Sequence, residues 1–240
     1  MKKPVIVGGK RPDGRAFDEM RPIEAKIGML TRADGSAVFR FGDTWAIAGV
    51  YGPRKVFPRH EEEAERAILR TEYRMASFST SERSRPGPSR RSQEISMVMR
   101  NSIIPTLFLE EFPRTAIDCI IEILQADAST RCAGINAAVL ALADAGVPMR
   151  DLVSSCSVGI VDGEIMLDIA GKEDTMGELD LPIAYYHRKK EITLMQMDGI
   201  ASPEQVKQLI RIAIKGCEQI YAAQQKALRA KYATEVPVVE

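Results

Sequence analysis

The chain has 240 residues, which is enough for one large domain or two small ones with a sizeable core. Its 33 basic and 33 acidic residues balance, so any nucleic-acid site must be a local basic patch. Two histidines exclude a histidine-rich metal site, and four widely spaced cysteines indicate reduced core thiols and neither a zinc site nor a disulfide framework. Because no signal region or membrane-length apolar run is visible, we expect a cytoplasmic protein without membrane contact.

The first part of the chain predicts an extended arm followed by a β-meander. Residues 1–20 are polar and contain Gly8, Gly9 and a Pro-Asp-Gly turn, so we expect a loosely ordered arm. Strand patterns follow, separated by turn residues at 33–35 and 42–43. The predicted strands cover residues 23–30, 35–41 and 44–50.

A strand at 69–78 is followed by a loop rich in serine, proline and arginine. Composition alone leaves two interpretations open: a solvated basic loop, or arginine forks that bind phosphate groups of a nucleic acid. The loop precedes a predicted helix capped by Ser92, whose dipole would favour the same anions. Its arginines are Arg83, Arg85, Arg90 and Arg91.

The middle of the chain predicts a buried strand at 115–125 and a helix at 132–145 that is apolar on all sides and ends at Gly146. Between them lie Ser129, Thr130 and Arg131. Simple N-capping explains one hydroxyl, but it does not explain an arginine at the start of so apolar a helix. We therefore favour a site for a small oxyanion such as phosphate.

The last third predicts a hairpin over 153–169, strands at 181–187 and 191–197, and a long helix that starts at the Ser202 capping box. The tail at 234–240 is expected to fray. These patterns predict one α+β domain spanning 1–240, with a mixed or antiparallel sheet and two packed halves, 1–150 and 151–240.

An acidic stretch joins the strand patterns of this last third. Such a cluster carries out acid–base chemistry, binds a hard cation, or coats a solvated turn. Asp180 stands between apolar residues, so it is expected to be partly buried and to need a partner or a metal. The five carboxylates are Asp168, Glu173, Asp174, Glu178 and Asp180.

Together, a basic loop, a small-anion junction and a carboxylate cluster suggest phosphoryl transfer with phosphate as a reactant. The sequence lacks the GxxxxGK[ST] phosphate loop, and neither histidine suggests a nucleophile–base pair. Several motifs, in this order, resemble the RNase PH family of phosphorolytic 3′→5′ exoribonucleases, and most of all the catalytic subunit of the archaeal exosome. They are RPDGR (11–15), ADGSA (33–37), PSRRSQEIS (88–96), ILQADASTR (123–131), ALADAGVPMRDL (141–152) and EDTMGELDLPIAY (173–185).

The resemblance implies an RNase PH-type fold with two similar βα halves, mixed sheets and packed helices. It also implies that inorganic phosphate attacks the 3′-terminal linkage of single-stranded RNA and releases nucleoside diphosphates. Asp174 matches the catalytic carboxylate, and Asp180 matches a second acid, the two holding Mg²⁺ or Mn²⁺. Ser129, Thr130 and Arg131, with Arg91, match the phosphate pocket, although Ala128-Ser129 replaces the paired glycines of many relatives. The matching RNA-binding residues are Arg59, Arg90 and Arg91.

The resemblance further implies partners: a homologous non-catalytic subunit that completes a six-membered ring, a trimer of heterodimers, and RNA-binding cap proteins. Two alternatives stay open, namely a non-catalytic RNA-binding ring subunit and a bacterial-type RNase PH that processes tRNA 3′ ends. Non-catalytic relatives usually lack one of the acids or the phosphate-pocket arginine, and Asp174, Asp180 and Arg131 are all present here. Hydrolysis is a third reading, which would release nucleoside monophosphates.

Overall fold

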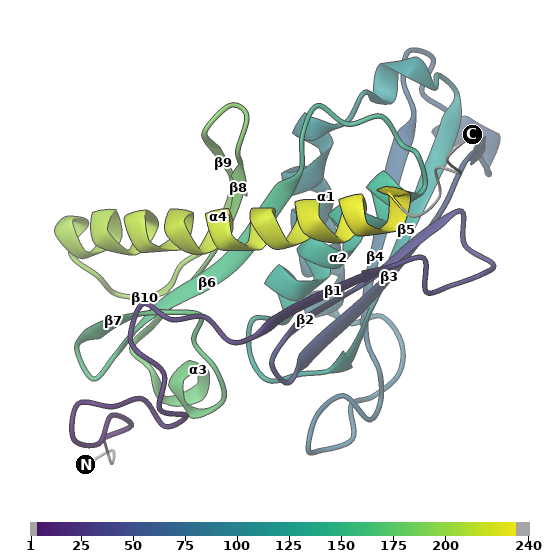
Figure 1. Cartoon of the computed structure of the whole chain (residues 1–240). Helices are drawn as coiled ribbons and strands as arrows, with labels where there is room; N and C mark the ends of the chain where they lie inside the picture. Colours follow the sequence, from purple (N-terminus) through teal and green to yellow (C-terminus); the bar gives the residue numbers. More distant parts are fainter. Residues whose placement is uncertain (1–3, 234–240) are drawn as a thin grey trace.

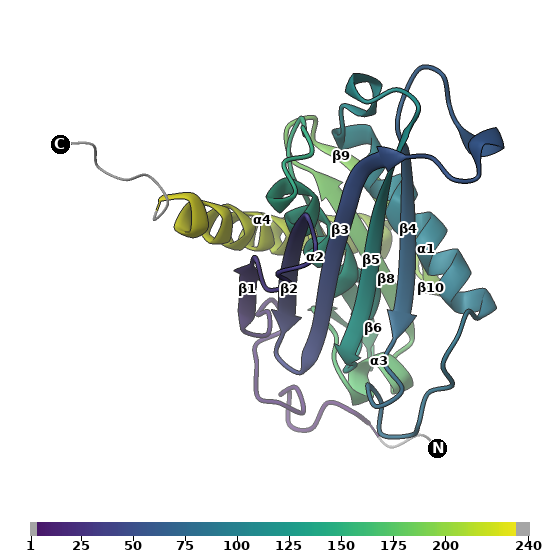
Figure 2. The ribbon, with the colours of Figure 1, turned by 90° about the vertical axis from the view of Figure 1, so that its right-hand side faces the viewer.

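Two five-stranded sheets build the fold of the computed structural model, which describes residues 4–233. The first sheet has the order β1-β2-β3-β5-β4, and only its β4–β5 pair is parallel, so it is mixed (Figure 2). Its strands are β1 (Ile23–Ile27), β2 (Gly35–Phe41), β3 (Thr44–Lys55), β4 (Ile68–Met75) and β5 (Thr115–Gln125).

The second sheet is antiparallel, with the order β10-β8-β6-β7 and β9 paired to β8. All of β6 is buried, because it lies in the middle of this sheet with helices packed on it. The strands are β6 (Val153–Val161), β7 (Glu164–Leu167), β8 (Leu179–Tyr186), β9 (Glu191–Met195) and β10 (Asp198–Gly199).

Helices α1 and α2 lie between the two sheets, and α4 crosses the second sheet and reaches β1 (Figures 1 and 2). Helix α2 packs on β2 and β3 on one side and on β6 on the other, which explains its all-round apolar sequence. The helices are α1 (Arg90–Ile103), α2 (Thr130–Asp144), α3 (Lys172–Met176) and α4 (Pro203–Ala233), with 3₁₀ turns at Arg59–Glu61, Ile104–Thr106 and Leu109–Glu111. Within residues 4–233, none of the helices has the length and apolarity that crossing a membrane requires.

The α+β class is confirmed, and most predicted elements are present with shifted ends. The connection before β2 differs from the predicted turn at 33–35. Strand β1 already ends at Ile27, and Gly35 is the first residue of β2, where close packing requires glycine. A Cβ on Gly35 would lie 2.2 Å from the Ala145 nitrogen, so only glycine lets β2 approach the end of α2 this closely. Gly42, with φ of +49°, does form the predicted two-residue turn between β2 and β3.

One local prediction was wrong. Ser89, and not Ser92, caps α1; Ser92 forms the other half of the capping box, so Arg90 and Arg91 lie inside the first helical turn. The acidic stretch between the last strand patterns contains the short helix α3. Residues 4–21 form no helix or regular strand, and the buried side chains of Arg11 and Arg21 anchor them. The division into halves 1–150 and 151–240 stays a prediction, and the tail at 234–240 lies outside the described residues.

Candidate active site

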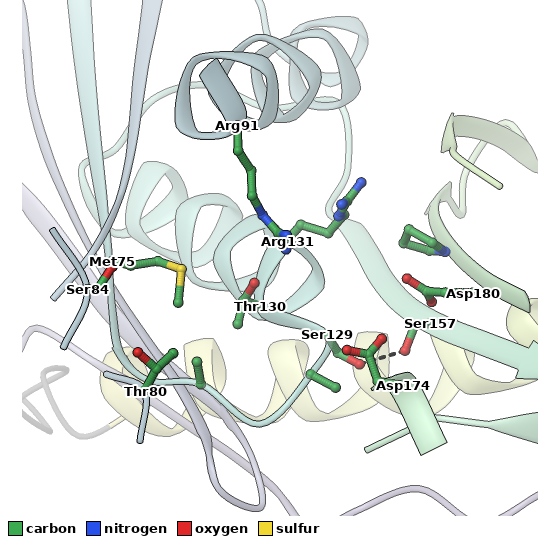
Figure 3. Close-up of a pocket in the computed structure, with 13 residues that line it drawn as sticks. Met75, Thr80, Ser84, Arg91, Ser129, Thr130, Arg131, Ser157, Asp174 and Asp180 are labelled. Atoms are coloured by element: carbon green, nitrogen blue, oxygen red, sulfur yellow. Dashed lines mark hydrogen bonds between the residues drawn. The ribbon is translucent and has the colours of Figure 1, made fainter. Parts of the chain in front are cut away.

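A cavity of about 390 Å³ opens where the end of β5, the start of α2 and the start of β8 meet (Figure 3). The structure thus brings together six residues that the sequence singled out: Arg91, Ser129, Thr130, Arg131, Asp174 and Asp180. The rest of the lining is Met75, Thr80, Ser84, Ala126, Ala128, Ser157 and Pro182. Both sheets contribute to the wall, so the cavity exists only when the two sheets are packed together.

The junction before α2 has an unusual backbone. Ala128 and Ser129 have φ of +61° and +53°, the left-handed region where glycine is least strained. Ser129 stands at the N-cap position, but its hydroxyl makes no capping bond; it lies 2.6 Å from the Ser157 hydroxyl. Without a side-chain cap, the first N–H groups of α2 remain available for an anion, which the helix dipole also favours.

Arg131 and Arg91 supply the positive charge of the cavity. Arg131 donates from Nη1 to the Gln196 side-chain oxygen, and Gln196 in turn donates to Glu94 at 2.9 Å. Arg91 extends from the first turn of α1 toward the same space (Figure 3). Thr130 accepts a hydrogen bond of 3.0 Å from the Tyr73 hydroxyl. Two guanidinium groups and a helix start can therefore surround one or two phosphate groups.

Asp174 and Asp180 face this positive charge from α3 and β8. Burial, together with the nearby Asp174 carboxylate, raises the pKa of Asp180 to about 6. Its Oδ1 atom is buried, and no hydrogen-bond partner is found for it among residues 4–233. Asp174 lies at the cavity mouth; partial burial raises its pKa, while Arg91 and Arg131 act in the opposite direction. Asp180 can therefore hold a proton near pH 6, and both carboxylates are available to a cation.

The predicted cluster of five carboxylates is split by the structure. Asp168 is 1% exposed and forms an ion pair with Arg21 at 2.7 Å; Glu173 is 2% exposed and pairs with Arg11 at 2.6 Å. Glu178 is exposed and does not line the cavity. Of the five carboxylates, Asp174 and Asp180 line the cavity, whereas arginines of the N-terminal arm neutralise Asp168 and Glu173.

Two predicted RNA-binding residues lie outside the cavity. Arg90 is exposed beside Arg91 but is not part of the lining. Arg59 follows β3, whose last residue Lys55 pairs with Thr115 at the start of β5, whereas the cavity follows the end of β5. Eleven strand residues separate these ends, roughly 30 Å. Arg59 is therefore not part of the lining of this chain's cavity.

Sequence reasoning missed Ser157, Tyr73 and Gln196. Ser157 had a weak signal, since three serines interrupt the otherwise apolar strand β6. No sequence signal pointed to Tyr73 or Gln196, because they contact Thr130 and Arg131 across 57 and 65 residues of sequence.

The carboxylate cluster left a hard-cation site open as one interpretation, and the resemblance implied Mg²⁺ or Mn²⁺. Within residues 4–233 no group of three or more His, Cys, Asp or Glu side chains could hold a metal. Mg²⁺ and similar hard cations are often bound by one or two carboxylates plus water and substrate phosphates, a donor set that Asp174 and Asp180 match. The buried Oδ1 of Asp180, which has no hydrogen-bond partner among residues 4–233, fits an oxygen-seeking cation.

The two packed sheets and the cavity between them define the class of protein. The 3′ exoribonuclease family model matches residues 19–148 with its domain 1 and residues 151–216 with its domain 2. The chain therefore belongs to the RNase PH family of 3′ exoribonucleases, as the sequence motifs predicted.

Within the family, the similarity is to archaeal exosome subunits. The chain is 54% identical over 224 residues to the exosome complex component Rrp41 of Pyrococcus furiosus, covering 93% of this chain and 90% of that protein. It is 51% identical over 224 residues to Rrp41 of Methanopyrus kandleri, covering 93% and 94%. Among solved structures, rice Rrp46 is 25% identical with a TM-score of 0.81, covering 91% of this chain and all of that one. These matches confirm the predicted type, an exosome subunit with the RNase PH fold.

Proposed function

We propose that this chain is a phosphorolytic 3′→5′ exoribonuclease, acting as the catalytic subunit of an exosome ring. The observation that carries the proposal is the convergence of Arg91, Arg131 and the uncapped start of α2 on two acids of raised pKa. A protein that only held RNA would gain nothing from a buried, unpartnered carboxylate beside its phosphate-binding arginines.

The proposed reaction joins an oxygen of inorganic phosphate to the phosphorus of the 3′-terminal linkage. The bond from that phosphorus to the preceding 3′ oxygen breaks, so a nucleoside diphosphate leaves and the shortened RNA gains a 3′ hydroxyl. The two phosphate groups repel each other, and their approach requires positive charge on both. We assign the attacking phosphate to Arg131, Arg91 and the first N–H groups of α2, and we assign Arg91 to the scissile phosphate as well.

The acids complete this arrangement. The leaving 3′ oxygen needs a proton, and the Asp174 carboxyl at the cavity is the candidate donor, because partial burial raises its pKa above the ordinary value. Asp174 and Asp180 would hold Mg²⁺ or Mn²⁺. When bound, such a cation supplies charge neutralisation for the phosphate oxygens. Asp180, buried and without a partner for Oδ1, is the residue best suited to that ligand role.

The proposal includes the partners that the family resemblance implies. The Rrp41 relatives carry the name exosome complex component, and rice Rrp46 shares this fold over 91% of the chain. We therefore propose a six-membered ring with a homologous non-catalytic subunit, RNA-binding cap proteins, and single-stranded RNA as substrate. Arg59 and Arg90, exposed and outside the cavity, are suited to bind RNA upstream of the reacting end.

The test is to purify the chain with and without its ring partner and to add RNA, phosphate and Mg²⁺. We expect nucleoside diphosphates, released one at a time and only when phosphate is present. Nucleoside monophosphates as the sole product would replace phosphorolysis by hydrolysis. Tight RNA binding without any nucleotide release from the assembled ring would favour the non-catalytic subunit.

A further inference from the structure

The N-terminal arm, residues 4–21, forms no helix or regular strand, yet two of its arginines are buried. Arg11 is 2% exposed and Arg21 is 6% exposed. A buried guanidinium is costly unless its donors and charge are matched. We propose that Arg11 and Arg21 are positioning residues that fix Asp174 against the phosphate-binding junction at 128–131; the catalytic consequence rests on the proposed function.

Arg11 anchors the segment 167–173, which leads from β7 into α3. Its Nε and Nη2 atoms donate to the two oxygens of Glu173 at 2.8 and 2.6 Å. Its other bonds include the carbonyl oxygens of Leu167 and Asp168, both at 2.8 Å. Since Glu173 immediately precedes Asp174, this one side chain joins the end of β7 to the helix that carries the acid.

Helix α3 depends on that anchor. It has five residues, which is far too short to be stable by itself, and its N-cap residue Gly171 provides no side-chain bond. Glu173 is the single buried residue of α3. Its carboxylate also accepts the Ala170 N–H at 3.0 Å, so the turn and the helix close around the same group. The place of Asp174 is therefore set largely through the ion pair of its neighbour.

Arg21 connects the two sides of the cavity. Its Nε and Nη2 atoms bind both oxygens of Asp168 at 2.9 and 2.7 Å, and its backbone N–H binds Asp168 as well, at 2.8 Å. Its Nη1 atom donates to the Asp127 carbonyl at 2.6 Å. The Thr44 hydroxyl lies 2.8 Å from the carbonyls of Asp127 and Ala128, which fixes the same junction from β3.

The arm thus ties the segment carrying Asp174 to the segment carrying Arg131. Phosphoryl transfer depends on placing groups correctly, and a misplacement of about 1 Å can lower the rate on the order of a hundredfold. Loss of either arginine is therefore expected to lower kcat. Arg21→Lys should also raise the KM for phosphate, because Arg21 alone of the two contacts the junction.

The experiment separates positioning from stability with the pair Arg11→Met/Glu173→Met. Replacing a buried ion pair by apolar side chains often leaves stability unchanged or improved. Here the carbonyls of Leu167 and Asp168 also lose their Arg11 donors, so the melting temperature should fall moderately. At a temperature where the variant stays folded, we expect a kcat roughly a hundredfold lower and nearly unchanged KM values for RNA and phosphate. Amide exchange of the 170–177 peptide, followed by mass spectrometry, should be on the order of tenfold faster. Arg11→Lys, which keeps the charge and loses the fork, should show the same changes more weakly.

The matched control is Lys231→Met, which removes a 2.5 Å ion pair to the buried Asp144 on the far side of α2. It should lower the melting temperature and leave kcat and the 170–177 exchange unchanged. A double variant with parental kcat and parental exchange would overturn the proposal. If the parent ring releases no nucleoside diphosphate, the proposed function fails. The positioning role is tested separately: it is overturned if amide exchange of the 170–177 peptide is not faster in the double variant.

Discussion

Two pairs of carboxylates lie within one short stretch of this chain and have opposite environments. Asp168 and Glu173 are buried, and each is held by an arginine fork. Asp174 and Asp180 line the cavity, have raised pKa values, and form no ion pair within residues 4–233. The difference shows that burial alone does not identify a catalytic acid; an unneutralised charge beside anion-binding groups does.

The largest effect should come from removing an unneutralised acid. Asp174→Ala is expected to lower nucleotide release at least about a hundredfold, since proton transfer by a placed side chain contributes that much or more. RNA binding, measured by fluorescence anisotropy, should be almost unchanged. Glu178→Ala, an exposed neighbour outside the cavity, is the control and should retain activity. Unchanged turnover in Asp174→Ala would remove this residue from the mechanism.

Substitutions in the ion-paired carboxylates, Asp168 and Glu173, should instead change the stability of the fold. Asp168→Asn removes the nearer counter-charge of the buried Arg21 guanidinium and leaves the Asp127 carboxylate at 3.8 Å, which is expected to cost up to about 3–5 kcal/mol of unfolding free energy. Urea denaturation followed by circular dichroism measures the loss. If the unfolding free energy falls by less than about 1 kcal/mol, Arg21 must find other partners for its charge. The ion-paired and the cavity carboxylates would then differ less than the structure shows.

Asp180→Asn should instead stabilise the fold. The native carboxyl has a pKa of about 6 against an ordinary value of 3.8, so the folded state binds its proton more tightly and is penalised once both states are ionised. The variant should gain at most ~3 kcal/mol above pH 6, and the gain should vanish below about pH 4. Unfolding in urea at pH 7.5 and 4 tests this. Activity should be lost at the same time; a variant less stable at pH 7.5 would contradict the assignment.

The smallest predicted effect distinguishes two adjacent arginines. Arg91 lines the cavity and Arg90 does not. Arg91→Glu should raise the KM for phosphate and weaken RNA binding on the order of tenfold, the cost of a charged hydrogen bond. Arg90→Glu should weaken RNA binding alone, and the slope of log affinity against log salt should fall by about 0.7 per lost phosphate contact. An equal rise in the KM for phosphate in both variants would show that the loop moves on binding.

Much of the site could be predicted because its signals are local. A hydroxyl–hydroxyl–arginine run between a buried strand and an apolar helix indicates an anion site from the sequence alone. The left-handed backbone at Ala128 and Ser129 could not be predicted, since neither residue favours it. Arg59 shows the reverse case, where a motif match does not reveal that the residue lies at the other end of the sheet.

By itself, the sequence determined the α+β class, the main elements, the family and the residues of the phosphate junction, because periodicity, turns and motifs are properties of neighbouring residues. Only the tertiary structure decided which carboxylates are neutralised. The arginines that bind Asp168 and Glu173 lie 147 and 162 residues away along the chain, and nothing in the local patterns LDIAG and KEDTM encodes that distance. The charge state of an acid depends on the groups that folding brings to it: within residues 4–233, Asp168 and Glu173 form ion pairs with arginines, and Asp174 and Asp180 form none.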